Sequence, residues 1–181
     1  MVYGSKSIIL KNNINAVFRN PEAADAKEMN RFLKTCFSET VYLTRYPEEM
    51  NQTERSEADF IERTNASKYC MMIVCMIDGE IVGNCTLIFN QGIKMKHRAS
   101  LAIGILQKWW GIGIGSAMLS EMISIAKKQG ILQIELEYVE GNNRACNLYE
   151  KMGFIHTGEK PNAIRLKDGT MLKEFFMIKE I

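Results

Sequence analysis

Apolar and polar positions alternate at the start of the chain and then change to a helical spacing. The segment NINAVFR alternates as a strand does, and residues 21–37, opened by Pro21 and acidic residues, predict a helix. A second helix is expected around Thr53–Asn65. Two apolar runs, YCMMIVCMI and IVGNCTLIF, then flank the sequence Asp78-Gly79-Glu80. This predicts a hairpin, because glycine readily takes the positive φ of a tight turn.

The second half of the chain continues with strands and two helices. RASLAIGIL predicts a strand, and two adjacent apolar stripes over residues 114–126 predict a helix that Gly130 ends. LQIELEYV is a further strand, Asn142 caps a short helix with apolar i, i+3, i+4, i+7 spacing, and Gly153 ends that helix. FIHTG and a second Asp-Gly hairpin follow. The pattern predicts one α+β domain, residues 1–181, around a mixed sheet with a βαβ-like unit in its middle.

Composition excludes several classes of protein. A chain of 181 residues with 46% apolar content suits one core, and a net charge of +2 from scattered residues gives no footprint for nucleic acid. The apolar run 70–77 is far shorter than the ~20 residues that cross a bilayer, and the start has no signal-peptide pattern. We therefore expect no nucleic-acid partner, no membrane and a cytoplasmic location. Five cysteines, mostly in apolar runs, predict reduced core thiols, and two histidines argue against a metal site.

Three glycines alternate directly before the central helix, in the stretch WWGIGIGSAML. Free backbone N–H groups and the helix dipole make such a place suitable for a phosphate or pyrophosphate. Gly111, Gly113 and Gly115 would let the ligand reach these amides or supply a positive φ. A tight turn alone needs only one glycine, so the anion site is favoured. Gly104, inside the preceding strand, indicates either a bulge or the close approach of a backbone or ligand.

Two nucleotide motifs fit this loop poorly. A Walker loop needs a lysine that is missing here, and Ser116 stands where a dinucleotide fingerprint needs its third glycine. The mismatch disfavours a nucleotide-cofactor oxidoreductase, although Glu137 lies roughly where a ribose-binding acid is expected.

The loop resembles the acetyl-CoA loop of the GNAT acyltransferase superfamily, and NNRACNLYEKMGF, residues 142–154, resembles that superfamily's later motif. The resemblance is good over residues 81–154 and covers the N-terminal third in outline. It implies the GNAT fold, a mixed, mostly antiparallel central sheet flanked by helices, with acetyl-CoA as co-substrate. Its pyrophosphate would lie at the loop and its pantetheine arm along the preceding strand. The coenzyme-binding residues that the resemblance implies are Ile103, Gly104, Ile105, Trp110, Gly111, Ile112, Gly113, Ile114, Gly115, Ser116, Asn142 and Tyr149.

One position departs from the family pattern. Trp110 stands where the family usually has Arg or Gln. Backbone amides bind the phosphates, so we expect coenzyme binding to survive this change. Trp109 and Trp110 are also explained as a cover for the edge of the sheet.

The resemblance also implies catalytic roles. Tyr149 matches the tyrosine that protonates the sulfur of coenzyme A, although its helical spacing equally suits a core tyrosine. Glu137 matches the base of the ribosomal-protein N-terminal acetyltransferases, or is an exposed strand glutamate beside Glu135. Arg144 and Lys151 could meet the 3′-phosphate of coenzyme A or form a solvated face.

The sequence says least about the identity of the acceptor substrate. Six acids and one arginine between Glu48 and Glu62 would favour a cationic acceptor if they faced the site, or are a solvated helix face. The leading hypothesis is an acetyl-CoA-dependent N-acetyltransferase acting on a primary amine of a small molecule, a polyamine or a protein N-terminus. The alternative is a non-catalytic acyl-CoA-binding regulatory module. The identity of the amine, the general base and the oligomeric state, including a homodimer, stay open.

Overall fold

Eight strands form one continuous sheet in the computed structural model, which describes all residues 1–181. Their order across the sheet is β1-β2-β3-β4-β5-β6-β8-β7, and every neighbouring pair is antiparallel except β5 and β6. The strands are β1 (Lys6–Ile9), β2 (Asn15–Arg19), β3 (Cys70–Ile77), β4 (Glu80–Phe89), β5 (Arg98–Ile105), β6 (Gln133–Val139), β7 (Ile155–Arg165) and β8 (Met171–Glu180). The predicted α+β class and the mixed, mostly antiparallel sheet are confirmed.

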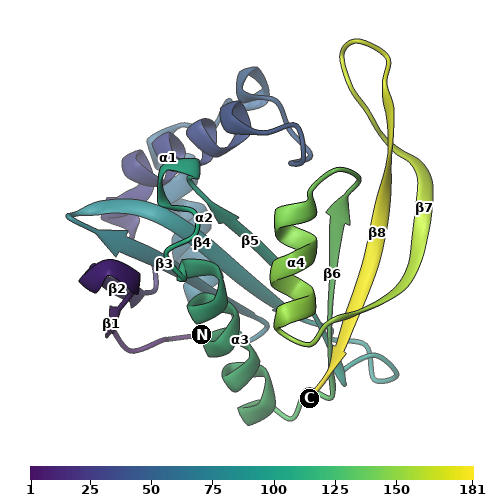
Figure 1. Ribbon diagram of the computed structural model, residues 1–181. Helices are drawn as coiled ribbons and strands as arrows, with labels where there is room; N and C mark the ends of the chain where they lie inside the picture. The colour runs from purple at the N-terminus through teal and green to yellow at the C-terminus, as the bar shows by residue number, and fades with distance from the viewer.

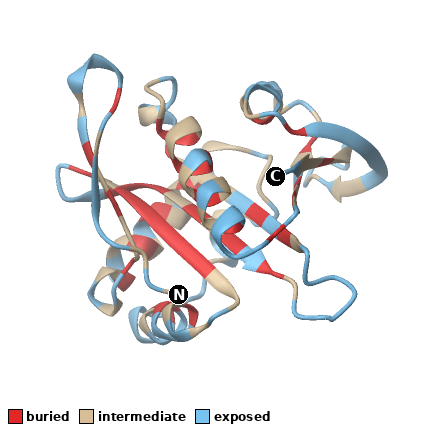
Figure 2. Cartoon of the chain, turned by 90° about the horizontal axis from the view of Figure 1, so that it is seen from below, coloured by how far each residue is buried: buried red, intermediate tan, exposed pale blue.

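Four helices cover the sheet, two on each face (Figure 1). They are α1 (Ala26–Glu39), α2 (Glu54–Ala66), α3 (Ile114–Lys128) and α4 (Asn143–Lys151). Successive strand residues point to opposite faces, so the buried side chains form two clusters. In β3, Ile73 and Cys75 join the cluster under α3 and α4, while Met72 and Val74 join the cluster under α1 and α2. Burial is concentrated in the central strands (Figure 2).

The sequence predictions agree with most of these elements. The hairpin between β3 and β4 turns on Asp78 and Gly79, both with positive φ. β5, α3 and β6 form the expected βαβ unit. Three details differ. β1 was not predicted, and α1 begins at Ala26 after a short 3-10 turn over Ala23–Asp25. Residues 155–158 of FIHTG and the start of the expected hairpin belong to one long strand, β7. Two irregularities in the pairing of β7 with β8 obscure its alternation in the sequence.

The parallel pair at the centre is short. β5 and β6 pair only over Arg98–Ser100 and Gln133–Glu135, and beyond these residues the two strands separate (Figure 1). Residues 101–105 of β5 therefore have a backbone partner on the β4 side alone. This split in the sheet positions the candidate site.

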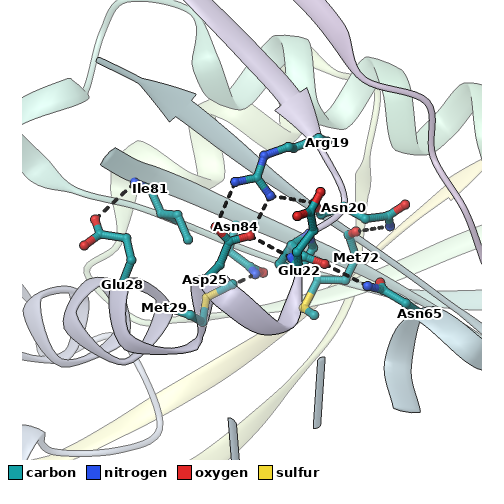
Figure 3. A network of polar contacts seen from close by, with 11 residues as sticks. Arg19, Asn20, Glu22, Asp25, Glu28, Met29, Asn65, Met72, Ile81 and Asn84 are labelled. Atoms are coloured by element: carbon teal, nitrogen blue, oxygen red, sulfur yellow. Dashed lines mark hydrogen bonds and ion pairs between the residues drawn. The ribbon is translucent and has the colours of Figure 1, made fainter. Parts of the chain in front are cut away.

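Polar contacts fix the start of α1 on the sheet (Figure 3). Arg19 at the end of β2 makes an ion pair with Asp25, with 2.5 Å between Nη1 and Oδ2. Glu28 accepts a hydrogen bond from the Ile81 N–H at 3.2 Å. The Asn20 side chain donates to the Met72 carbonyl at 2.7 Å. These contacts hold the helix whose far end, and the loop after it, line the site.

The five cysteines are free thiols, and Cys36, Cys75 and Cys85 are buried, as expected for reduced core residues. No helix has both the length and the apolar character that a membrane crossing requires.

Candidate active site

The glycine loop joins β5 to α3 and leaves a row of backbone N–H groups without acceptors. Gly111 and Gly113 have φ of 83° and 101°, a left-handed conformation that favours glycine. The first α-helical hydrogen bond of α3 runs from Ala117 N–H to Gly113 O, and no N–H of residues 111–116 donates within the protein. The loop therefore presents the amides that the sequence predicted, at a helix N-terminus with its positive potential.

The third glycine has a different role. Gly115 lies inside the first turn of α3 without a positive φ, and a Cβ there would lie 2.7 Å from Cδ2 of Leu148. Its missing side chain lets α3 and α4 approach each other. The sequence argument gave all three glycines one role, whereas the structure separates two turn glycines from one packing glycine.

A cleft of about 760 Å³ opens beside this loop, between β5, α3, α4 and the end of α1 with the segment that follows it. We call it the loop cleft. Of the twelve expected coenzyme-binding residues, eleven line the cleft and Ile112 does not. The eleven are Ile103, Gly104, Ile105, Trp110, Gly111, Gly113, Ile114, Gly115, Ser116, Asn142 and Tyr149. Three cationic side chains and one carboxylate also line it, namely Lys11, Arg144, Lys151 and Glu39. The cleft thus combines free amides with excess positive charge.

The open edge of β5 forms one wall of the loop cleft. Leu106 N–H donates to Val82 O and Asn90 N–H to Arg98 O, so the even-numbered residues of β5 bond to β4. Ile103 and Ile105 therefore direct their backbone groups to the other edge, where β6 has already separated. Gly104 has neither a bulge nor a positive φ, and a Cβ there would meet only ordinary contacts. The bulge explanation for this glycine is wrong.

Trp110 covers part of this edge, as expected if the tryptophans shield the edge of the sheet. Its indole N–H donates to the Ile105 carbonyl at 2.7 Å, and the Arg144 guanidinium lies 4.8 Å from the ring centroid. The N–H of Ile105 and both backbone groups of Ile103 are not involved in this contact. The loop is also held by Lys11 N–H, which donates to Ile112 O at 3.1 Å.

Helix α4 brings Tyr149 to the split in the sheet. Asn142 caps this helix, since its Oδ1 accepts the Ala145 N–H at 3.2 Å. Tyr149 is only 6% exposed, and no hydrogen bond joins its hydroxyl to another protein group. Burial, with a smaller effect of Cys85, raises the pKa of this phenol well above its usual range. A protonated hydroxyl without a hydrogen-bond partner in the protein can donate a proton to a ligand.

A second cavity, of about 960 Å³, lies on the α1 side of the same split. We call it the splay cavity. Ile134, Leu136 and Met177 point into the core under α3 and α4, so the alternate residues of β6 and β8 point the other way, into this cavity. Its charged lining consists of Glu135, Glu137, Glu174 and Arg98. Five residues line both cavities, namely Tyr42, Leu43, Ile103, Asn142 and Tyr149.

The carboxylates of the splay cavity have different partners. Glu135 lies 3.4 Å from Nε of Arg98. Glu137 is exposed and lies opposite Phe176 of β8, with Glu174 two residues away on the same face. The pKa of Glu174 is raised, by burial first and then by the negative charge of Glu137, with Lys160 opposing. Glu137 and Glu174 thus form an acidic pair that Arg98 does not neutralise.

Sequence reasoning missed Glu174 and Tyr42. Alternation within MLKEFFMI places Glu174 on one face with Phe176, but the pairing of β8 with β6 decides which cavity that face meets. Conversely, none of the acids between Glu48 and Glu62 lines either cavity. Glu48 pairs with Lys167, and Glu49 accepts the Tyr46 N–H at 2.6 Å. That acidic segment is not a wall of the site.

Cys146, Glu150 and His156 lie within 4.8 Å of one another on α4 and β7, outside both cavities. They are the one group of three or more side chains that could hold a metal ion. The sequence expectation of no metal site did not consider this group.

Comparison with known proteins identifies the class first. A solved GNAT family acetyltransferase from Streptococcus pneumoniae superposes with a TM-score of 0.85 and 26% identity, over 92% of this chain and 99% of that one. The structure of yncA from Salmonella typhimurium with its cofactor acetyl-CoA gives a TM-score of 0.78 at 17% identity, over 92% and 94%. The fold is the GNAT acyltransferase fold, as the sequence resemblance implied.

The family follows from the sequence match. Residues 27–154 match the acetyltransferase (GNAT) family, and this chain belongs to it. A curated relative, L-amino acid N-acetyltransferase AaaT of Escherichia coli (strain K12), is 30% identical over 110 residues. That match covers 59% of this chain and 66% of the relative, slightly less than two thirds of its length. Family members are acetyl-CoA-dependent N-acetyltransferases, and the mostly antiparallel sheet excludes the dinucleotide-binding alternative.

Proposed function

We propose that this protein transfers the acetyl group of acetyl-CoA to a primary amine. The coenzyme occupies the loop cleft, the amine enters the splay cavity, and the two substrates meet at the split between β5 and β6. One observation carries this proposal. Tyr149 and Asn142 of α4 and Ile103 of β5 line both cavities, so ligands in the two cavities can touch the same side chains.

The residues of the loop cleft suit the parts of acetyl-CoA. The free amides of residues 111–116 hold its pyrophosphate, and the backbone groups of Ile103 and the N–H of Ile105, which face away from β4, pair with the pantetheine amides. Arg144 and Lys151 supply positive charge for the 3′-phosphate. When bound, acetyl-CoA supplies an activated acyl group.

The chemistry needs a group that removes a proton and a group that supplies one. Glu137 in the splay cavity takes a proton from the acceptor ammonium or from the amine as it attacks. The new C–N bond forms and the C–S bond breaks, while Tyr149 holds its proton at the hydroxyl for the departing sulfur. Its raised pKa keeps this proton in place throughout the neutral range.

The test is thiol release from acetyl-CoA with a panel of amines, combined with mass detection of the acetylated product. The panel includes L-amino acids, the acceptor class in the name of the relative AaaT, together with polyamines, aminoglycosides and peptides. Acetyl-CoA without amine measures background hydrolysis. An acetylated amine formed well above this background supports the proposal. Coenzyme binding without any acetylated product contradicts it and favours the non-catalytic acyl-CoA-binding module.

A further inference from the structure

The splay cavity carries a charge pattern that neither the family nor the sequence motifs assign. Three of its four charged side chains are carboxylates, and the one cation, Arg98, lies against Glu135. Glu137 and Glu174 remain without a cation inside the cavity. Lys160, which lies opposite Glu174 on β7, is exposed and does not line the cavity.

The register of the sheet brings these two acids together. Glu137 lies opposite Phe176, and Glu174 lies opposite Val139, so the two are diagonal neighbours on one face of an antiparallel pair. The negative charge of Glu137 adds to the larger effect of burial and raises the pKa of the Glu174 carboxyl. Neighbouring carboxylates repel unless a proton or another cation lies between them. Such a pair gains more from binding a cation than either acid alone.

Two further observations point to a ligand at this place. Tyr149, 6% exposed and without a hydrogen-bond partner for its hydroxyl, lines the same cavity as the acidic pair. The lining also includes the aromatic side chains Phe37, Tyr42 and Phe176. Aromatic faces attract alkylammonium groups and offer little to a carboxylate.

We propose that the splay cavity selects an acceptor with a second ammonium group, a di- or polyamine, and that Glu174, with the negative charge of Glu137 beside it, binds that positive charge. Glu174 is then a specificity-determining residue. The inference rests on the proposed function, since it names the acceptor class of the same site. An acceptor with a free carboxylate is disfavoured, because the one cation, Arg98, lies 3.4 Å from Glu135 and the other two charged side chains of the cavity are carboxylates.

Three acceptors of equal chain length test this: putrescine, the corresponding amino alcohol and the corresponding amino acid. They differ only in whether the far end is positive, neutral or negative. For the wild type, we expect kcat/KM to fall in that order, by about tenfold between putrescine and the amino alcohol. Glu174→Gln should reduce this preference to near unity, mainly through KM for putrescine.

The matched control is Glu54→Gln. It removes the same charge from an exposed position at the start of α2 that lines neither cavity. This variant should keep the wild-type preference. An equal loss of preference in Glu54→Gln and Glu174→Gln would mean that net charge, and not the acidic pair, selects the acceptor, and would overturn the inference.

Binding is measured separately from turnover, as the increase in Tm that putrescine or the amino alcohol causes in the presence of coenzyme A. A larger, Glu174-dependent shift with putrescine and no turnover of any amine supports the inference and contradicts the proposed function. Turnover that favours the amino alcohol or the amino acid supports the proposed function and contradicts the inference. If no amine binds and none is acetylated, both the inference and the proposed function are contradicted.

Discussion

The loop cleft and the splay cavity meet at the split in the sheet and offer different chemical groups to a ligand. The loop cleft uses backbone amides at residues 111–116 and an excess of cationic side chains. The splay cavity uses side chains of β5, β6, β8 and the segment after α1, and most of its charges are carboxylates. Five residues line both cavities, namely Tyr42, Leu43, Ile103, Asn142 and Tyr149.

The difference explains how one fold can keep a coenzyme and change its acceptor. Backbone amides do not depend on residue type, provided that the glycines allow their conformation. Side chains on a strand can be exchanged without moving the strand, so the acidic lining is free to vary with the substrate. We therefore expect substitutions in one cavity to leave binding in the other unchanged, except at the shared residues.

The largest effect is expected for Glu137→Gln, which removes the proposed base from the splay cavity. The rate constant kcat for the best amine should fall by about 10²- to 10⁴-fold, while the Tm increase caused by acetyl-CoA stays the same. Steady-state kinetics and thermal shifts measure the two quantities. A variant that keeps the wild-type kcat would assign the base to another group.

Tyr149→Phe tests the shared boundary. Removing the hydroxyl keeps the ring that packs beside Phe154 and Tyr138, so the fold and both affinities should change little. The value of kcat should fall by up to ~10²-fold, and the loss can be smaller because a thiolate with a pKa of ~8.5 also leaves unassisted. Equal kcat for both proteins at every pH would make Tyr149 a core residue only.

Gly113→Val should affect the loop cleft alone. The left-handed φ of 101° disfavours a branched side chain, so the loop must move its amides and acetyl-CoA should bind at least about tenfold more weakly. Isothermal titration with acetyl-CoA measures this.

The control for that experiment is Gly130→Val, at a glycine with φ of 72° at the other end of α3 and far from both cavities. Both variants introduce the same kind of backbone strain. If they weaken coenzyme binding equally, the loss comes from general destabilisation and the role of the loop amides is contradicted.

The smallest effect concerns the stability of the ligand-free protein. The pKa of Glu174 is higher in the folded than in the unfolded state, so the folded protein binds more protons and loses stability as pH rises above the unfolded value of ~4.3. Glu174→Gln should therefore raise Tm slightly at neutral pH, and the gain should disappear below that value. A Tm difference that does not depend on pH would show that ionisation of Glu174 does not destabilise the folded protein.

Sequence reasoning recovered the loop cleft better than the splay cavity. The glycines, the cap at Asn142 and Tyr149 lie within two short motifs, and local backbone rules predict the turn at Gly111 and Gly113 and the cap at Asn142. Acidic residues are most concentrated in the sequence between Glu48 and Glu62, but none of these acids lines either cavity. The acids of the splay cavity come instead from β6 and β8, which are adjacent in the sheet. Glu137 and Glu174 are 37 positions apart in the sequence.

The sequence by itself determined the class of fold, the order of the helices and most strands, and the conformation of the glycine loop, because these depend on apolar spacing and on φ preferences of neighbouring residues. Only the tertiary structure decided where β5 and β6 separate, that Gly115 serves the packing of α3 against α4, and that Glu174 meets Glu137. Each of these depends on contacts between segments far apart in the chain, and no local preference specifies which strand lies beside which.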